Sequence, residues 1–146
     1  MKIYLGTDHA GFELKESIKQ FLIEKGHDVE DFGASSFDKE DDYPDFIKPV
    51  AEAVARDPEQ SRGIILGGSG QGEAITANRF KGVRAVVYYG GDIDIVKLSR
   101  EHNNANVLSF GARFVSEQEA KQAIELWLSI EFEGGRHQRR IDKIDG

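Results

Sequence analysis

The stretch Arg62–Glu73, RGIILGGSGQGE, joins a short apolar run to a glycine-rich loop. The run predicts a buried strand at 62–67, and the loop leads into a helix predicted at about 71–80. Loops of this kind often hold phosphate groups with backbone N–H groups at a helix N-terminus. They commonly place a lysine after the last glycine, but this chain has Glu73 there. A carboxylate repels a phosphate, so we expect this loop to serve a different chemistry.

The rest of the chain alternates strand-like and helix-like segments. Further strands are expected at 2–7, 27–33, 83–89 and 106–111, and further helices at 12–25, at 92–102, up to Arg56, and after Ser116, where Glu119 completes a capping box. Pro49 is expected in the first turn of the helix that ends at Arg56. Residues 34–43 show no period and predict a loop. Apolar strands that alternate with helices indicate a single three-layer α/β/α domain spanning 1–146, with a five-stranded parallel sheet and a short basic C-terminal helix.

Composition limits the classes of protein that fit. The 146 residues, 39% hydrophobic and 31% charged, suit one globular domain. No apolar run approaches the roughly 20 residues of a membrane span, and the first residues turn polar too soon for a signal peptide. The lack of cysteine excludes disulfides, thiolate nucleophiles and cysteine-bound metals, and it fits a cytoplasmic protein.

The charge pattern favours a small anionic ligand over a polymer. The formal net charge of −7 argues against a general attraction to nucleic acid or to an anionic membrane. The C-terminal stretch GGRHQRRIDKIDG is nevertheless basic. Its Arg136 and Arg140 are four residues apart, so a helix would place both guanidinium groups on one face, where they can bind a phosphate. A solvated basic helix is the alternative.

Polar residues follow three of the predicted strands at the point where each strand ends. Asp8 and His9 follow the first strand, the glycine loop follows the third, and Arg113 follows the fifth. Ligands of open α/β sheets bind outside the carboxyl ends of the strands, so we expect these groups to form one site. For any single group, the alternative is an ordinary turn residue.

The glycine loop matches neither of the common nucleotide-binding motifs. Gly67 to Gly72 has P-loop spacing, but Glu73 and Ala74 replace the lysine and the serine or threonine. A dinucleotide fingerprint would lie in the first strand–helix turn, not in the third. The backbone N–H groups can instead stabilise an oxyanion formed during reaction, with help from Ser69, while Glu73 acts as a general base beside a carbonyl. The alternative for Glu73 is a first-turn acid favoured by the helix dipole.

Several long motifs occur in the order found in one family. They are GTDHAGFELK (6–15), DYPDF (42–46), GIILGGSGQGEAITANR (63–79), GVRAVV (82–87), LSREHNNANVLSFGAR (98–113) and EGGRHQRR (133–140). Through them the chain resembles the ribose-5-phosphate isomerase B and galactose-6-phosphate isomerase family over nearly its whole length. The resemblance implies a Rossmann-like fold, a homodimer or dimer of dimers, and an aldose–ketose isomerase that acts on a sugar phosphate through a cis-enediol, without metal or organic cofactor.

The resemblance also implies catalytic roles by position. Asp8 and His102 would assist opening of the sugar ring, and Glu73 would move a proton between C2 and C1. The enediolate would be held by Ser69 and by the backbone of Gly68, Gly70 and Gly72. Some members of the family use a cysteine as the base at the position of Gly67, whereas this chain resembles the glutamate-using branch.

The implied substrate is a small sugar phosphate, with ribose 5-phosphate first. The phosphate would be bound by His9, Arg113, Arg136 and Arg140, and the site would be lined by Asn103 and Tyr43. A tetrose phosphate, or a hexose phosphate such as allose or galactose 6-phosphate, is an alternative substrate for the same chemistry. A non-catalytic flavodoxin-like binding module is an alternative of another class.

His102 is expected to lie away from the other catalytic residues. It ends a helix that runs back from the fourth strand, near the amino ends of the strands, whereas Asp8 and Glu73 lie at the carboxyl ends. A strand of five or six residues separates these edges by roughly 17–20 Å. A two-fold partner could supply His102, and a symmetric dimer would then contain two shared sites. The alternative is a histidine stabilised by the helix dipole.

Overall fold

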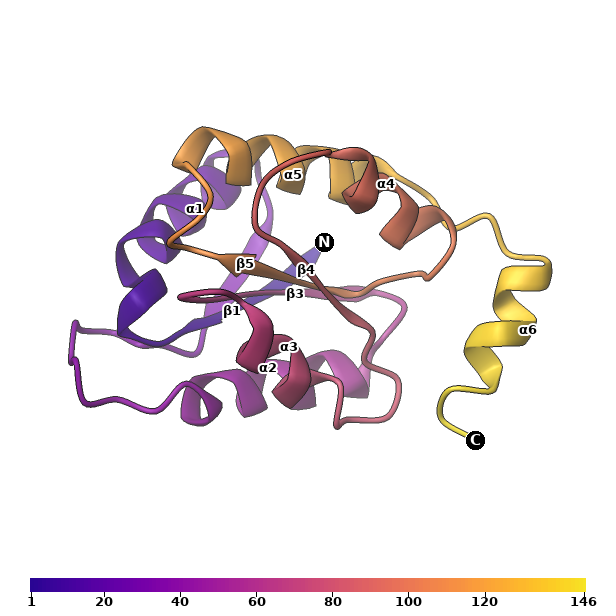
Figure 1. The fold of residues 1–146 in the computed structure, drawn as a ribbon, viewed down its shortest axis with the longest axis horizontal. Coiled ribbons are helices and arrows are strands. Elements are labelled where there is room, and N and C mark those ends of the chain that lie inside the picture. The colour runs from indigo at the N-terminus through magenta and orange to yellow at the C-terminus, as the bar shows by residue number, and fades with distance from the viewer.

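A computed structural model describes the whole chain, Met1–Gly146, as strands that alternate with helices (Figure 1). The strands are β1 (Lys2–Thr7), β2 (Asp28–Asp31), β3 (Ser61–Gly67), β4 (Ala85–Tyr88) and β5 (Val107–Gly111). The helices are α1 (Phe12–Glu24), α2 (Pro44–Arg56), α3 (Gln71–Ala77), α4 (Asp94–Glu101), α5 (Glu117–Ser129) and α6 (Arg136–Asp142), and a short 3-10 turn covers His9–Gly11. No helix combines the length and the apolar character needed to cross a lipid bilayer.

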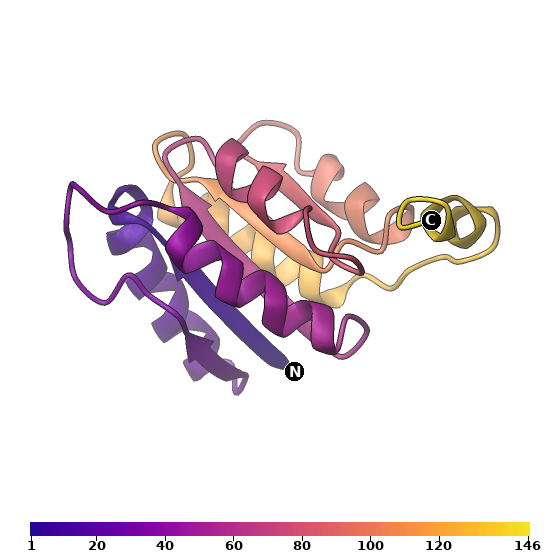
Figure 2. The same ribbon diagram turned by 90° about the horizontal axis from the view of Figure 1, so that it is seen from below.

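The five strands form one parallel sheet in the order β2-β1-β3-β5-β4. Helices α1, α4 and α5 cover one face, and α2 and α3 cover the other (Figures 1 and 2). All seven residues of the central strand β3 are buried, as expected for a strand with helices on both sides. The predicted three-layer α/β/α fold is therefore confirmed, including its short C-terminal helix.

Two apolar layers hold the helices to the sheet. Ile64 and Leu66 point into the layer beneath α1, α4 and α5, where Trp127 is also fully buried. Ile65 points the opposite way, into the layer beneath α2 and α3 with Val50. This alternation follows from the two-residue period of a strand. Because full burial of such a side chain contributes roughly 1.5–3 kcal/mol, the sheet is a firm support for the loops at its edge.

The structure corrects the sequence prediction for α2. The helix begins at Pro44, whose fixed φ angle suits the first helical position, and Pro49 lies in the helix interior rather than in the first turn. Proline in the interior removes one backbone hydrogen bond. The buried face of α2, with Ile47, Val50 and Val54, continues through that point, so its burial outweighs the loss. The predicted capping box of Ser116 is confirmed.

The carboxyl ends of β1, β3 and β5 lie next to one another. After β1 the chain moves to β2 on one side, and after β3 it moves to β4 and then β5 on the other, so β1 and β3 form the topological switch point. The Thr7 hydroxyl donates to the Leu66 carbonyl oxygen at 3.0 Å, which joins β1 to β3. The Ala112 N–H donates to the Gly67 carbonyl oxygen at 2.8 Å, which joins β3 to β5. Ligands bind in the crevice outside such a switch point.

A buried ion pair holds the segment that follows β2. The Lys15 ammonium group is fully buried and donates to the two Asp31 carboxylate oxygens at 2.9 and 2.8 Å. It also donates to the Ala34 carbonyl oxygen at 2.6 Å. Asp31 accepts a further hydrogen bond from the Gly33 N–H at 2.8 Å. The ion pair therefore fixes the backbone of residues 33 and 34.

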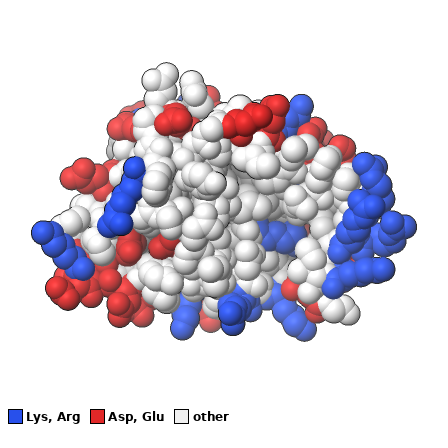
Figure 3. All heavy atoms as spheres, in the orientation of Figure 1, with Lys and Arg blue, Asp and Glu red and all other residues white.

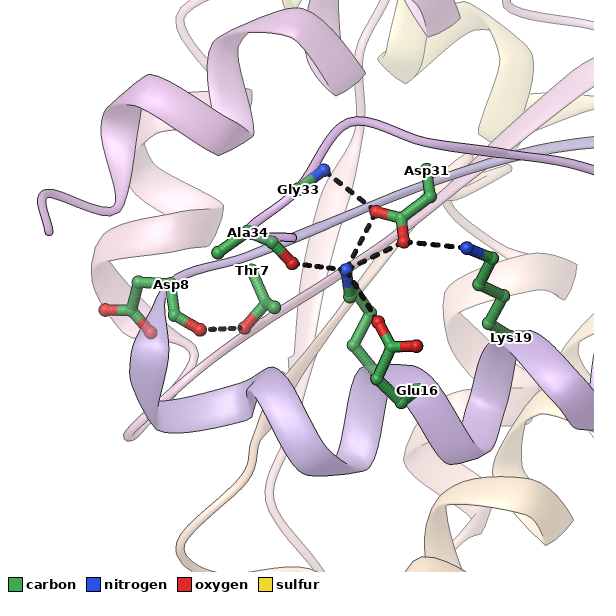
Figure 4. Close-up of polar contacts among 8 residues, drawn as sticks. Thr7, Asp8, Glu16, Lys19, Asp31, Gly33 and Ala34 are labelled. Carbon is green, nitrogen blue, oxygen red and sulfur yellow. Dashed lines mark hydrogen bonds and ion pairs between the residues drawn. The ribbon is translucent and has the colours of Figure 1, made fainter. Parts of the chain in front are cut away.

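This fixed backbone supports the turn that carries Asp8. The Thr7 N–H donates to the Gly33 carbonyl oxygen at 2.8 Å, and the Ala34 N–H donates to the Thr7 carbonyl oxygen at 2.7 Å. Figure 4 shows these residues beside Asp8. The position of Asp8 thus depends on a lysine seven residues further along the chain.

Lys15→Met is expected to lower the free energy of unfolding by about 3 kcal/mol, because it removes the main partner of a largely buried carboxylate. Urea unfolding measures this loss. The matched control is Lys19→Met, which removes a more exposed lysine 3.3 Å from the same carboxylate. This control is expected to cost less than about 1 kcal/mol, and equal losses in the two variants would contradict the role given to Lys15.

Candidate active site

The glycine loop joins the end of β3 to the start of α3 in a tight turn. Gly70 precedes α3 with a φ angle of 80°, a conformation that favours glycine. A Cβ atom at this position would lie 2.9–3.0 Å from backbone atoms of Phe110 and Gly111. The Gly70 carbonyl oxygen accepts a hydrogen bond from Ser109 Oγ at 2.7 Å. The loop is therefore held against β5. It lies at the N-terminal end of α3, where the first backbone N–H groups have no partner within the helix.

Glu73 places its carboxyl group over the backbone of Gly67. The residue is only 4% exposed, although it belongs to the first turn of a helix. A Cβ atom at Gly67 would overlap this carboxyl group. The carboxyl group thus fills the space that a side chain at position 67 would occupy.

Burial raises the pKa of Glu73 above its ordinary value. The hydrogen bond from its own backbone N–H acts in the opposite direction, and the nearby Asp8 carboxylate adds to the rise. The helix dipole acts to lower the pKa of a first-turn acid, and the burial of Glu73 opposes this effect. A carboxylate with a raised pKa accepts a proton more readily than an ordinary one does.

Asp8 and His9 follow the end of β1, and Asp8 lies close enough to Glu73 to affect its pKa. Asp8 is 8% exposed, and its Oδ1 accepts a hydrogen bond from the Ala10 N–H at 3.0 Å. His9 pairs through Nδ1 with Oδ1 of Asp41 at 2.7 Å. Asp41 was not predicted from the sequence, because it lies in the aperiodic loop 34–43, and its only signal is its place directly before the DYPDF motif.

Arg113 and Tyr43 contact the glycine loop. A Cβ atom at Gly68 would lie 3.0 Å from Nη1 of Arg113, and one at Gly72 would lie 2.7 Å from Oη of Tyr43. The Arg113 N–H also donates to the Gly68 carbonyl oxygen at 3.1 Å. Ser69 is exposed on the same loop. The structure therefore brings together the predicted site residues of the carboxyl edge: Asp8, His9, Tyr43, Gly68, Ser69, Gly70, Gly72, Glu73 and Arg113.

The other predicted site residues lie elsewhere in the chain. His102 and Asn103 follow α4 before β5 begins, and Arg136 and Arg140 belong to α6. The five residues of β5 separate the two edges of the sheet by roughly 17 Å. Figures 1 and 2 show α6 at the opposite end of the molecule from the loop before α2, and Figure 3 shows basic side chains gathered over α6. One chain does not bring these four residues to its own Glu73.

The second group of residues surrounds its own hollow of about 390 Å³. It is lined by His102, Asn103, His137, Arg140, Ile141 and Ile144. The rings of His102 and His137 stack with centroids 4.3 Å apart, and His102 Nε2 lies 3.8 Å from Glu133 Oε1. Burial lowers the pKa of His137 below its ordinary value, and neighbouring cationic groups, chiefly Arg136, add to this effect. His137 is buried and packs against His102.

Two sets of side chains bring possible metal ligands within 4.8 Å of one another: Asp8, His9 and Asp41, and His102, Glu133 and His137. In the first set, the hydrogen bond between the histidine and an aspartate already accounts for the approach. In the second, the imidazole planes differ by only 13°, so one ion cannot lie in the plane of both stacked rings. We assign a metal to neither set.

Comparisons with known proteins cover almost the whole chain. A family model described as Ribose/Galactose Isomerase matches residues 3–144. The chain is 45% identical to ribose-5-phosphate isomerase B of Escherichia coli K12, over 98% of this chain and 93% of that protein. It is 42% identical to a probable ribose-5-phosphate isomerase B of Mycoplasma genitalium, over 97% of this chain and 92% of that protein.

Solved structures agree with these sequence matches. A crystal structure of Mycoplasma genitalium ribose-5-phosphate isomerase B with bound ribulose-5-phosphate superposes with a TM-score of 0.94 at 42% identity, covering 98% of this chain and 93% of the other. The Thermotoga maritima ribose 5-phosphate isomerase gives a TM-score of 0.91 at 44% identity, covering 99% and 97%. The similarity therefore extends over both edges of the sheet and includes α6.

Gly67→Ala is expected to reduce turnover at least about 100-fold, because the added methyl group displaces the carboxyl group of Glu73. The effect is measured as kcat on a sugar phosphate. In the double variant Gly67→Ala/Glu73→Gln, the loss should be no larger than in Glu73→Gln alone, since both changes remove the same interaction. Additive losses would show that position 67 acts independently of Glu73.

Proposed function

The chain belongs to the ribose/galactose isomerase family, and on this premise we propose that it interconverts ribose 5-phosphate and ribulose 5-phosphate with Glu73 as the base. The observation that carries the role of Glu73 is its buried carboxyl group, seated on the bare backbone of Gly67 beside the glycine loop. No other carboxylate contacts that loop in this way: Asp8 is held by the turn after β1.

The proposed reaction moves one proton between two neighbouring carbons. Glu73 removes the C2 proton of the open-chain aldose, the C–H electron pair forms a C1–C2 double bond, and the carbonyl electrons move onto O1. The hydroxyl proton on O2 passes to O1, so that the negative charge moves to the C2 oxygen. The protonated carboxyl group then returns its proton to C1 as the C2 oxygen becomes the ketone. Backbone N–H groups of the glycine loop and the Ser69 hydroxyl stabilise the intermediate enediolate, where one preorganised donor contributes roughly 3–4 kcal/mol.

Ring opening and phosphate binding use groups around this centre. Asp8, close to Glu73, and His102 of the partner subunit assist opening of the furanose ring. The phosphate group is bound by His9 and Arg113 of one subunit, and Arg136 and Arg140 are available only from the other. Asn103 and Tyr43 line the sugar site. These assignments rest on the positions of the residues in the family motifs. They also rest on the separation of the residues at the carboxyl edge of the sheet from those near α4 and α6.

The shared site requires a homodimer, and the surface of the chain supports one. β4 is an edge strand, and a hollow of about 250 Å³ between it and α4 is lined mainly by apolar side chains. Ile95 and Leu98 on α4 and the aromatic residues Tyr89 and Phe114 are exposed. Apolar residues gathered at an edge strand mark a surface that a partner covers. Tyr89 and Phe114 also form a small hollow with Ser69, so this surface reaches the glycine loop.

Glu73→Gln is expected to lower kcat on ribose 5-phosphate at least about 100-fold with little change in KM, because the amide binds like the acid but cannot accept a proton. Ketose formation measures turnover, and a tetrose phosphate and a hexose phosphate assayed alongside decide substrate size. In the parent, kcat/KM should rise with pH through a pKa above the 4.5 of ordinary glutamate. The matched control is Glu13→Gln, which removes an exposed first-turn acid of α1 and should leave kcat unchanged. Near-parental turnover in Glu73→Gln would exclude Glu73 as the base.

Mixing inactive Glu73→Gln and His102→Ala subunits is expected to restore activity. A hybrid dimer contains one site in which both residues are intact, so random exchange should recover up to about a quarter of parental activity. Mass spectrometry of differently tagged subunits confirms the exchange. No recovery among confirmed hybrids would show that each site takes both residues from one chain.

A further inference from the structure

The pair formed by His9 and Asp41 is the best-defined polar contact at the mouth of the site. Oδ1 of Asp41 lies 2.7 Å from Nδ1 of His9 and accepts a second hydrogen bond from the His9 backbone N–H at 3.2 Å. The Asp41 side chain is only 8% exposed, whereas that of His9 is 24% exposed. The carboxylate is therefore buried behind the ring, and the ring faces the solvent side of the site.

These contacts determine which ring nitrogen is free. A carboxylate only accepts hydrogen bonds, so Nδ1 carries the hydrogen that Asp41 receives. Nε2 makes no hydrogen bond within the chain, which leaves it for a ligand. The ring of Phe37 meets the imidazole edge-on, with centroids 5.9 Å apart at 88°, and limits its rotation from another side. The orientation of Nε2 is thus set before any ligand binds.

The charges around His9 favour its cationic form. The hydrogen bond to Asp41 raises the pKa of His9, and the Asp8 and Asp41 carboxylates raise it further. Burial and the Arg113 guanidinium group act in the opposite direction, and the net shift is upward. A neutral histidine could offer only a lone pair from Nε2, which a phosphate oxygen would repel. An imidazolium offers an N–H donor and a positive charge, as phosphate requires.

The position of Asp41 distinguishes it from the other acids of its loop. Asp38, Glu40 and Asp42 are exposed, and they would only repel an approaching phosphate. Figure 3 shows acidic side chains gathered at the end of the molecule that carries this loop in Figure 1. Among these acids only Asp41 has a buried side chain, and its carboxylate is hydrogen-bonded to His9. An acid placed next to a phosphate site is useful only when it keeps a cation charged and oriented.

We propose that Asp41 is a positioning residue that holds His9 as an imidazolium with its Nε2–H directed at the phosphate group of the substrate. The inference rests on the proposed function in taking His9 as a phosphate ligand. It goes further by making phosphate affinity depend on pH through a residue outside the motifs that identify the family. Asp41 itself does not touch the substrate.

Asp41→Asn tests this role with inorganic phosphate as the probe. At about pH 7.5 the variant should bind phosphate about 3- to 10-fold more weakly than the parent, because a smaller fraction of its His9 is protonated there. At about pH 5.5 His9 is protonated in both proteins, and the variant should bind phosphate at least as tightly. Calorimetric titration with phosphate measures the affinity of the parent and of the variant at each pH. The ratio of the two affinities at one pH does not depend on the ionisation of phosphate itself. An equal weakening at both pH values would overturn the proposal, since a merely structural defect does not disappear on acidification.

The matched control is Asp42→Asn, which removes the same charge from the adjacent exposed residue. Its phosphate affinity should equal that of the parent at both pH values. A loss equal to that of Asp41→Asn would overturn the proposal, because removal of any nearby negative charge would then have the same effect. A second measurement needs no variant: nitrogen NMR of His9 in the parent, above its pKa, should show the neutral ring protonated at Nδ1. Protonation at Nε2 would overturn the proposal. Both readouts are independent of turnover, so they can fail while the isomerase assignment stands.

Discussion

The candidate active site depends on the contact between the carboxyl group of Glu73 and the bare backbone of Gly67. β3 delivers Gly67 to the edge of the sheet, and the left-handed conformation of Gly70 turns the chain so that the first turn of α3 folds back over it. Any side chain at position 67 would occupy the volume of the carboxyl group. The carboxyl group of Glu73 can take this position only because residue 67 is a glycine. The family resemblance fits this exclusion, since the branch with a base at position 67 has no need of a carboxylate in the same space.

Burial of Glu73 provides a stronger base and lowers the stability of the fold. Its pKa is raised in the folded state, so the folded state binds a proton more tightly than the unfolded chain does. The resulting stabilisation is present below the unfolded pKa and is lost as the pH rises through the folded pKa. Above the folded pKa, the ionised and buried carboxylate therefore lowers the free energy of unfolding. The buried parallel sheet and the Lys15–Asp31 ion pair beneath the neighbouring loop are the features that support it.

The fold could be derived from the sequence because its determinants are local. Apolar strands, helical periods and the Ser116 capping box each depend on a few adjacent residues, and they gave the correct layers. Pro49 was misplaced because a helix-breaking preference was overridden by the burial of Ile47, Val50 and Val54. In the candidate site, the cluster of Asp8, Glu73 and Arg113 followed from strand ends alone. Asp41 and Lys15 could not be predicted, because their partners lie 32 and 16 residues away in sequence and no period links them.

The parallel sheet explains why the predicted site residues fall into two groups. All strands point the same way, so the glycine loop and Asp8 gather at one edge, while residues that follow helices, such as His102, return to the other. Only a second chain in the opposite orientation can bring the two edges together. In the proposed dimer the exposed apolar surface would meet this requirement, because Leu98 lies close to His102 in sequence whereas Tyr89 and Phe114 adjoin Ser69. A two-fold contact across this surface would set the His102 end of one subunit beside the glycine loop of its partner, and α6 would carry Arg136 and Arg140 to the same place. Under the proposed function, the basic C-terminal helix of an acidic protein would bind the phosphate group in a site whose base lies in the other subunit.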